Sequence, residues 1–225
     1  MEEIGGSMYI IGIIDDEIKQ VATIKRTIKT NAPQDEKYDF KAYELPEDSG
    51  QLVDCVYTEV MDDIVMQKIS CLIIDYKIMV RTTKIKGTDI FGKIKERVPK
   101  FPVIILTERV NESIEPIFID ADKVYSKTDF FKLRDDYSKE KVRNIFDSMR
   151  KYTDQKDSLQ LRLSESKRKL SNNSGVEEGI REVLQIESIL DDFIPTNQTQ
   201  IDKVFDEQKA KSIVELIEKA NSMLD

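Results

Sequence analysis

Residues 71–78, with the sequence CLIIDYKI, decide the fold of this chain. An apolar run leads into a single carboxylate, Asp75, and polar residues follow it. A short, continuous apolar run of this kind is typical of a strand that is buried on both faces of a parallel sheet. Ligands of such sheets bind outside the carboxyl ends of the strands, so we expect Asp75 at the edge where chemistry takes place.

The same apolar pattern recurs along the chain, and amphipathic stretches separate the apolar runs. It predicts strands at 9–14, 38–43, 71–75, 103–106 and 123–126. Helical spacing predicts helices at 17–30, 51–68 and 88–98, with a short irregular helix at 111–119. Strands that alternate with helices indicate an α/β fold: a five-stranded parallel sheet with right-handed crossovers and helices on both faces.

Composition narrows the function. The net charge of −8 argues against a nucleic-acid-binding surface, and the absence of histidine excludes both a typical zinc site and a histidine general base. No apolar run approaches the ~20 residues of a membrane span, so we expect no membrane association and a cytoplasmic protein. Cys55 and Cys71 both lie in apolar stretches and are expected in the core rather than in a disulfide.

The region 137–225 has a different character and is predicted to be all-α. Helical spacing marks 138–150, with a pattern that extends toward Leu170, and then 176–193 and 200–224. Apolar stripes of this width need a partner, either one another in a bundle or a second chain. No basic recognition helix is apparent, so we do not expect DNA binding. Residues 1–7 are expected to be a leader or tag remnant outside the fold.

Polar side chains stand where the predicted strands end. Asp15 and Asp16 follow the first strand, Asp75 the third, Thr107 the fourth and Lys127 the fifth. Because the carboxyl ends of parallel strands meet at one edge, these five side chains should lie close together. Clustered carboxylates repel one another unless a cation neutralises them, and their oxygens suit Mg²⁺. The set fits phosphoryl transfer to Asp75, assisted by the metal and by the lysine.

These motifs resemble the receiver domain of bacterial two-component response regulators, which has a flavodoxin-like fold. The matching motifs, in chain order, are IDDE at 14–17, LIID at 72–75, GTDI at 87–90, ILT at 105–107 and SKTDF at 126–130. The resemblance covers residues 8–136. It implies that a receiver-like domain fills this range. The helical spacing of 137–225 predicts a helical extension used for bundling, dimerisation or partner docking.

The resemblance also implies roles for the clustered residues. Asp75 would be the phosphoacceptor, Thr107 the switch hydroxyl that contacts the phosphoryl group, and Lys127 the ion partner of that group. The expected ligands of Mg²⁺ are the carboxylates of Asp75 and of the pair at 15–16, together with the backbone carbonyl of Lys77.

Some positions depart from the pattern of the family. Glu108 follows Thr107 where the family prefers a small residue, and a carboxylate there can repel an incoming phosphoryl group. The family has an aromatic switch residue three positions before the lysine, and here Val124 occupies that position. Strand alternation turns the neighbouring Tyr125 to the opposite face of the sheet.

Two functions follow as alternatives. The first is a signalling protein, not a metabolic enzyme, that accepts a phosphoryl group on Asp75 from a histidine kinase or phosphotransfer protein. It would catalyse only its own phosphorylation and dephosphorylation, and would signal through protein contacts or a homodimer formed by residues 137–225. The second is a receiver-like adaptor that binds a protein partner without phosphorylation. A small-molecule phosphatase is disfavoured, because Lys77 stands where that class needs a second aspartate.

Overall fold

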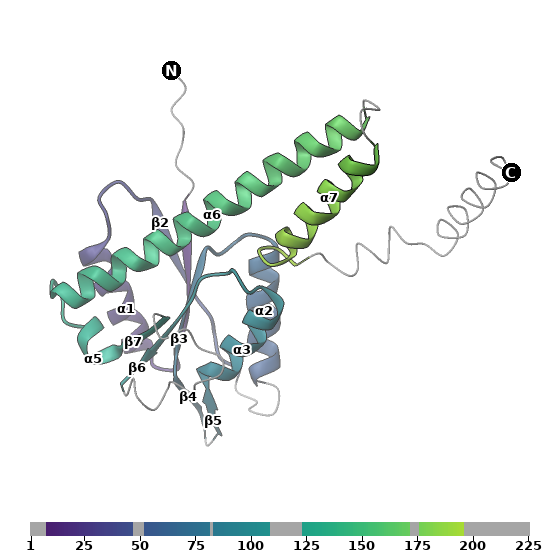
Figure 1. Ribbon diagram of the computed structural model, residues 1–225. Helices are drawn as coiled ribbons and strands as arrows, with labels where there is room; N and C mark the ends of the chain where they lie inside the picture. Colours follow the sequence, from purple (N-terminus) through teal and green to yellow (C-terminus); the bar gives the residue numbers. More distant parts are fainter. Residues whose placement is uncertain (1–7, 47–51, 82, 109–122, 172–175, 196–225) are drawn as a thin grey trace, which may run out of the picture. The chain divides into compact units, whose positions relative to one another are not determined.

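Figure 1 shows the computed structural model of the chain. The structure describes residues 8–46, 52–81, 83–108, 123–171 and 176–195. The chain divides into two compact units, Met1–Ile194 and Pro195–Asp225, and the description below concerns the first of them. The helices predicted at 111–119 and 200–224 lie outside the described residues.

The core of the fold is a parallel sheet of five strands in the order β2-β1-β3-β6-β7. All four neighbouring pairs are parallel, and β3 lies at the centre. This is the flavodoxin-like strand order, so the predicted fold class is confirmed. The strands are β1 (Tyr9–Ile14), β2 (Tyr38–Ala42), β3 (Cys71–Asp75), β6 (Val103–Thr107) and β7 (Val124–Ser126).

Helices cover both faces of the sheet, as the alternating pattern predicts (Figure 1). Strand residues that point to one face pack against Ile24 and Ile28 of one helix and Phe146 of another. Strand residues that point to the opposite face pack against helices that contribute Val60 and Phe91. The helices are α1 (Ile18–Asn31), α2 (Leu52–Val65), α3 (Gly87–Arg97), α5 (Lys127–Phe130), α6 (Asp136–Ser171) and α7 (Val176–Asp191).

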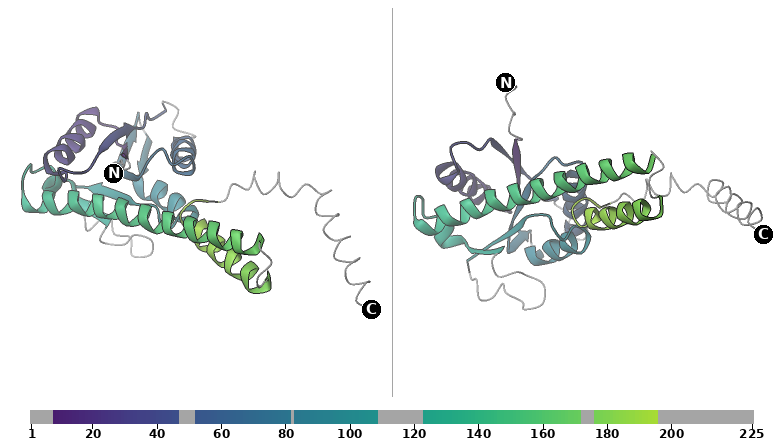
Figure 2. Two further views of the ribbon diagram at one scale, coloured as in Figure 1. Left: turned by 90° about the horizontal axis from the view of Figure 1, so that it is seen from above. Right: turned by 45° about the horizontal axis from the view of Figure 1, so that its top comes forward.

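Helix α6 is 36 residues long and has two different environments. Its first half supplies fully buried side chains, among them Val142 and Phe146, to the core beneath the sheet. Its second half continues past the sheet and pairs with α7 (Figure 2). The compact unit that contains the sheet therefore extends beyond residue 136, where the sequence analysis places a domain boundary, and reaches Ile194.

Specific contacts hold α6 and the α7 segment to each other and to the rest of the unit. The Tyr152 hydroxyl of α6 donates a hydrogen bond to the Phe193 carbonyl at 2.7 Å, and the Tyr152 ring packs edge-on against Phe101 at 5.5 Å. Lys167 and Glu187 form a salt bridge of 2.8 Å between the two helices. The all-α character predicted for this region is thus confirmed for its described residues. None of the described helices is both long and apolar enough to span a bilayer.

A two-stranded antiparallel ribbon that the sequence analysis did not predict follows Asp75. It consists of β4 (Lys77–Val80) and β5 (Thr83–Lys86). Ile78, Val80 and Ile85 are buried against the α2–α3 side of the core, which gives the ribbon its anchored face. Each strand has only four residues, KIMV and TKIK, and neither alternates apolar with polar residues along its length, so the sequence does not distinguish the ribbon from a loop.

The expectation that both cysteines are buried is wrong for Cys55. Cys71 is buried in β3, whereas Cys55 is exposed on α2. The neighbouring Val56 and Val60 face the core, and Cys55 lies one position away from that face.

An ion-pair network joins β2 to α2 around Asp63, whose side chain is only 4% exposed. Asp63 pairs with Lys41 and accepts a hydrogen bond from the Tyr43 hydroxyl at 2.8 Å. Burial opposes the charge of Asp63, but these bonds outweigh it and lower the pKa of the carboxyl.

We therefore expect Asp63→Asn to lower the free energy of unfolding at pH 7 by about 2 kcal/mol. Because the pKa of Asp63 is lower in the native state than in the unfolded state, the carboxylate stabilises the fold at pH values above its unfolded-state pKa. This stabilisation is lost as the pH falls through the native-state pKa. The difference between variant and wild type should accordingly shrink in acid, as measured by urea denaturation across pH. Asp62→Asn, at an exposed neighbouring position, is the control; equal losses in both variants would contradict the role of the network.

Candidate functional site

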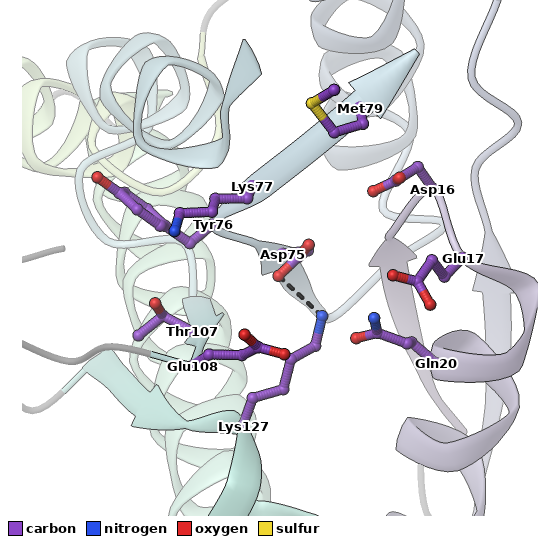
Figure 3. Close-up of a pocket in the computed structure, with 10 residues that line it drawn as sticks. All are labelled: Asp16, Glu17, Gln20, Asp75, Tyr76, Lys77, Met79, Thr107, Glu108 and Lys127. Carbon is purple, nitrogen blue, oxygen red and sulfur yellow. Dashed lines mark ion pairs between the residues drawn. The ribbon is translucent and has the colours of Figure 1, made fainter. Parts of the chain in front are cut away.

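Residues from three strand ends meet around one buried lysine (Figure 3). Lys127 begins α5 directly after β7, and its side chain is 4% exposed. Its Nζ lies 2.8 Å from Oδ1 of Asp75, at the end of β3, and 3.0 Å from Oδ2 of Asp15, just after β1. Thr107, the last residue of β6, is buried beside them at 2% exposure. The structure thus brings together the residues that the sequence places at strand ends.

The three aspartates form a compact group of carboxylates. Asp15, Asp16 and Asp75 each offer one oxygen, and these oxygens lie within 4.8 Å of one another. Asp15 and Asp75 are buried, and the Asp15 carboxylate accepts a hydrogen bond of 2.9 Å from the Glu17 amide, which fixes its orientation. Converging hard oxygen ligands at the mouth of a cavity fit Mg²⁺. Lys77 lines the same cavity, and the role of its backbone carbonyl as a ligand stays a prediction.

Burial and charge compete at this cluster. Burial raises the pKa of Asp75 to about 6, although the bond with Lys127 opposes the shift. Burial also raises the pKa of Asp15, against the Glu17 amide and Lys127. Burial alone would lower the pKa of Lys127, but its hydrogen bonds and the two carboxylates outweigh burial and raise it. The single positive charge of Lys127 therefore pairs with two carboxylates, those of Asp15 and Asp75. A divalent cation would neutralise the remaining negative charge of the cluster.

The cluster opens into a cavity of about 210 Å³. Asp75, Thr107 and Lys127 line it from the strand ends, while Lys77 and Met79 line it from the ribbon. Helix α1 contributes Gln20, and its entry turn contributes Asp16 and Glu17. Gln20 was not predicted as a site residue, although its place three residues after Glu17, in the first turn of the helix expected at 17–30, was a usable signal.

The structure shows where the residues that depart from the receiver-domain pattern lie. Glu108 lines the cavity beside Lys127 and is exposed (Figure 3). Tyr125 is buried and packs on Phe130, with ring centroids 6.3 Å apart, in the core under α6.

Comparisons with known proteins give a small set of likenesses. No family model and no curated protein matches the chain. Among solved structures, it is similar to a response regulator receiver domain from Rhodospirillum rubrum, with 16% identity, a TM-score of 0.33, and coverage of 60% of this chain and 87% of that one. It is also similar to the RcsB response regulator of Salmonella typhimurium, with 13% identity, a TM-score of 0.39, and coverage of 87% and 97%.

At TM-scores below 0.5 these two matches add nothing to what strand order and site geometry establish. The sheet has the flavodoxin-like order, and the motif residues that prompted the resemblance meet at its carboxyl edge. In fold and in the placement of these residues, the chain resembles the receiver domains of response regulators.

Proposed function

We propose that this chain is a response-regulator-like signalling protein that accepts a phosphoryl group on Asp75 from a histidine kinase or phosphotransfer protein, with Mg²⁺. The observation that carries the proposal is the position of Lys127. Its ammonium bridges Asp75 and Asp15 at the floor of an open cavity. A buried cation beside a nucleophilic carboxylate is the arrangement that phosphoryl transfer to an aspartate needs.

The transfer is a displacement at phosphorus. An oxygen of Asp75 attacks the phosphorus atom of the donor, a new P–O bond forms to the carboxylate, and the bond between phosphorus and the donor group breaks. The electron pair of that bond leaves with the donor. Lys127 offsets negative charge on the phosphoryl oxygens, and the Thr107 hydroxyl can donate a hydrogen bond to one of them. Mg²⁺ held by Asp15, Asp16 and Asp75 would supply further charge neutralisation.

The output of such a protein would pass through its helices. The first half of α6 packs under the sheet, and the second half pairs with α7, so a single helix connects the core near the site to the region beyond it. A shift of α6 caused by phosphorylation would therefore move the α6–α7 pair. We propose that residues 137–225 carry the contacts with a partner protein or a second copy of the chain.

The test is incubation of the wild-type protein with acetyl phosphate, followed by intact-mass spectrometry. We expect one phosphoryl adduct when Mg²⁺ is present and a sharply lower yield when a chelator replaces it, because the three carboxylates need a divalent cation before they admit an anionic donor. A folded protein that forms no adduct at any Mg²⁺ concentration would contradict the proposal.

A second candidate is the phosphorylation-independent adaptor, and the position of Glu108 favours it. This carboxylate lines the cavity where a phosphoryl group would sit and would repel a dianion. Under the adaptor function, neither wild type nor Glu108→Ala would form an adduct. An adduct that forms only in Glu108→Ala would identify the glutamate as the block.

A further inference from the structure

Gln20 is the residue of the cavity that the phosphoryl-transfer scheme leaves without a role. It lines the cavity together with Asp75 and Lys127. Its Oε1 atom is inaccessible to solvent and accepts no hydrogen bond from any residue in the described part of the chain. Figure 3 shows its amide reaching from α1 toward Lys127. A buried acceptor without a partner is unfavourable, which indicates that Gln20 is placed for something that enters the cavity.

Backbone hydrogen bonds fix where α1 begins. The backbone N–H of Glu17 donates to the Asp15 carboxylate at 2.9 Å, and the Glu17 carbonyl accepts from the backbone N–H groups of Gln20 at 2.8 Å and Val21 at 3.1 Å. The first turn of α1 is thus tied to an aspartate of the acidic cluster. The backbone of Gln20 is therefore held in a set place relative to that cluster.

We propose that Gln20 positions the water molecule that hydrolyses the aspartyl-phosphate at Asp75, and so sets the lifetime of the phosphorylated state. The inference rests on the proposed function. A glutamine amide suits this task once its side chain turns Oε1 toward the cavity, because the oxygen then accepts a hydrogen bond from water while the NH₂ group donates one to a phosphoryl oxygen. Glutamine orients the attacking water in other phosphoryl-transfer proteins for the same reason.

Hydrolysis then proceeds as follows. The water oxygen forms a bond to phosphorus, the bond between phosphorus and the Asp75 oxygen breaks, and its electron pair returns to the carboxylate. The proton lost by the water ends on the released phosphate. Gln20 remains neutral and unchanged, so it acts as a positioning residue. Asp16 and Glu17, which line the cavity from the entry turn of α1, are carboxylates, and a carboxylate would repel the phosphoryl group.

The test compares the decay of the phosphorylated protein in wild type and in Gln20→Met, which keeps the length of the side chain but removes the amide. Protein loaded with acetyl phosphate and Mg²⁺ is separated from the donor, and the adduct is followed by intact mass. We expect decay about three- to tenfold slower in the variant, the effect of one lost hydrogen bond in the transition state. The phosphorylated fraction at steady state should rise accordingly.

Thr27→Val is the matched control. The Thr27 hydroxyl is the second buried side-chain atom without a partner among the described residues; it lies on the same helix but does not line the cavity. Its removal should leave the decay rate at the wild-type value. Equal slowing in both variants would assign the effect to the packing of α1 and overturn the inference.

The remaining outcomes separate this inference from the proposed function. A wild type that is phosphorylated, with Gln20→Met decaying at the same rate or faster, overturns the role of Gln20 and leaves the proposed function standing. A wild type that forms no adduct overturns the proposed function, and the inference falls with it. Gln20→Ala provides a second variant should the methionine disturb α1, and urea denaturation verifies that each variant is folded.

Discussion

Asp75→Asn is expected to form no phosphoryl adduct under conditions in which the wild type does. The amide retains the shape of the side chain but lacks a nucleophilic oxygen, and Asp15 is held by the Glu17 amide and Lys127 rather than presented to the cavity. Intact-mass spectrometry after incubation with acetyl phosphate and Mg²⁺ measures the result. Asp62→Asn, on the exposed side of α2, serves as the control and should be phosphorylated like the wild type.

The same substitution should raise stability when no divalent cation is present. Burial raises the pKa of Asp75 in the native protein to about 6, above its ordinary value of 3.8. The native state therefore binds more protons than the unfolded state between these values, and stability falls as the pH rises through this window. Above about pH 6 the native protein bears the full cost of burying the ionised Asp75 carboxylate. Asp75→Asn should therefore raise the free energy of unfolding by about 1–3 kcal/mol at pH 7 in the presence of a chelator.

Urea denaturation of wild type and Asp75→Asn checks this stability effect. A range from about pH 4 to about pH 8 covers the interval between the ordinary and the raised pKa of Asp75. The variant should show a weaker pH dependence. A variant that is less stable than the wild type at pH 7 would contradict the conclusion that burial of the Asp75 charge is costly.

Gly87→Ala is expected to cost about 3 kcal/mol of unfolding free energy and to disturb the site. A Cβ atom at Gly87 would lie 2.1 Å from the backbone oxygen of Asp75 and 2.8 Å from Cγ2 of Ile74. The Gly87 amide also donates a hydrogen bond of 2.8 Å to the Tyr76 carbonyl, which ties the start of α3 to the residue after Asp75. Backbone atoms must therefore move to admit the methyl group, and the phosphoacceptor moves with them.

Gly92→Ala is the matched control for this prediction. Gly92 lies in the same helix, and a Cβ atom there would meet nothing within 4 Å. Alanine is the better helix former, so this variant should gain about 0.5–1 kcal/mol. Thermal or urea unfolding measures both variants. A loss in Gly87→Ala no larger than the change in Gly92→Ala would show that the close approach to Asp75 is easily relaxed.

The sequence predicts the sheet and the site well because both depend on short-range patterns. Continuous apolar runs identify the buried strands. Because the carboxyl ends of parallel strands meet at one edge, the sequence alone predicts that Asp15, Asp75, Thr107 and Lys127 lie close together. The structure confirms the five-stranded parallel sheet and the proximity of the carboxylates. These features are predicted correctly as long as the end of each strand is placed to within one or two residues.

Features that depend on tertiary packing were not predicted. The β4–β5 ribbon has strands of four residues, too short for alternation to identify, and its anchored face becomes apparent only when Ile78 and Ile85 are seen in the core. Cys55 has apolar neighbours but points away from them, because one position along a helix changes the face by about 100°. The two environments of α6 follow from where the sheet ends, which helical spacing does not encode.

The central claim is that Asp75 itself receives the phosphoryl group. Borohydride reduces an acyl phosphate to an alcohol, so treatment of the phosphorylated wild type followed by peptide mass spectrometry marks the modified carboxyl. We predict the reduced residue at position 75 and at no other carboxyl of the cavity. Reduction at Asp15, Asp16 or Glu108, with Asp75 intact, would contradict the account.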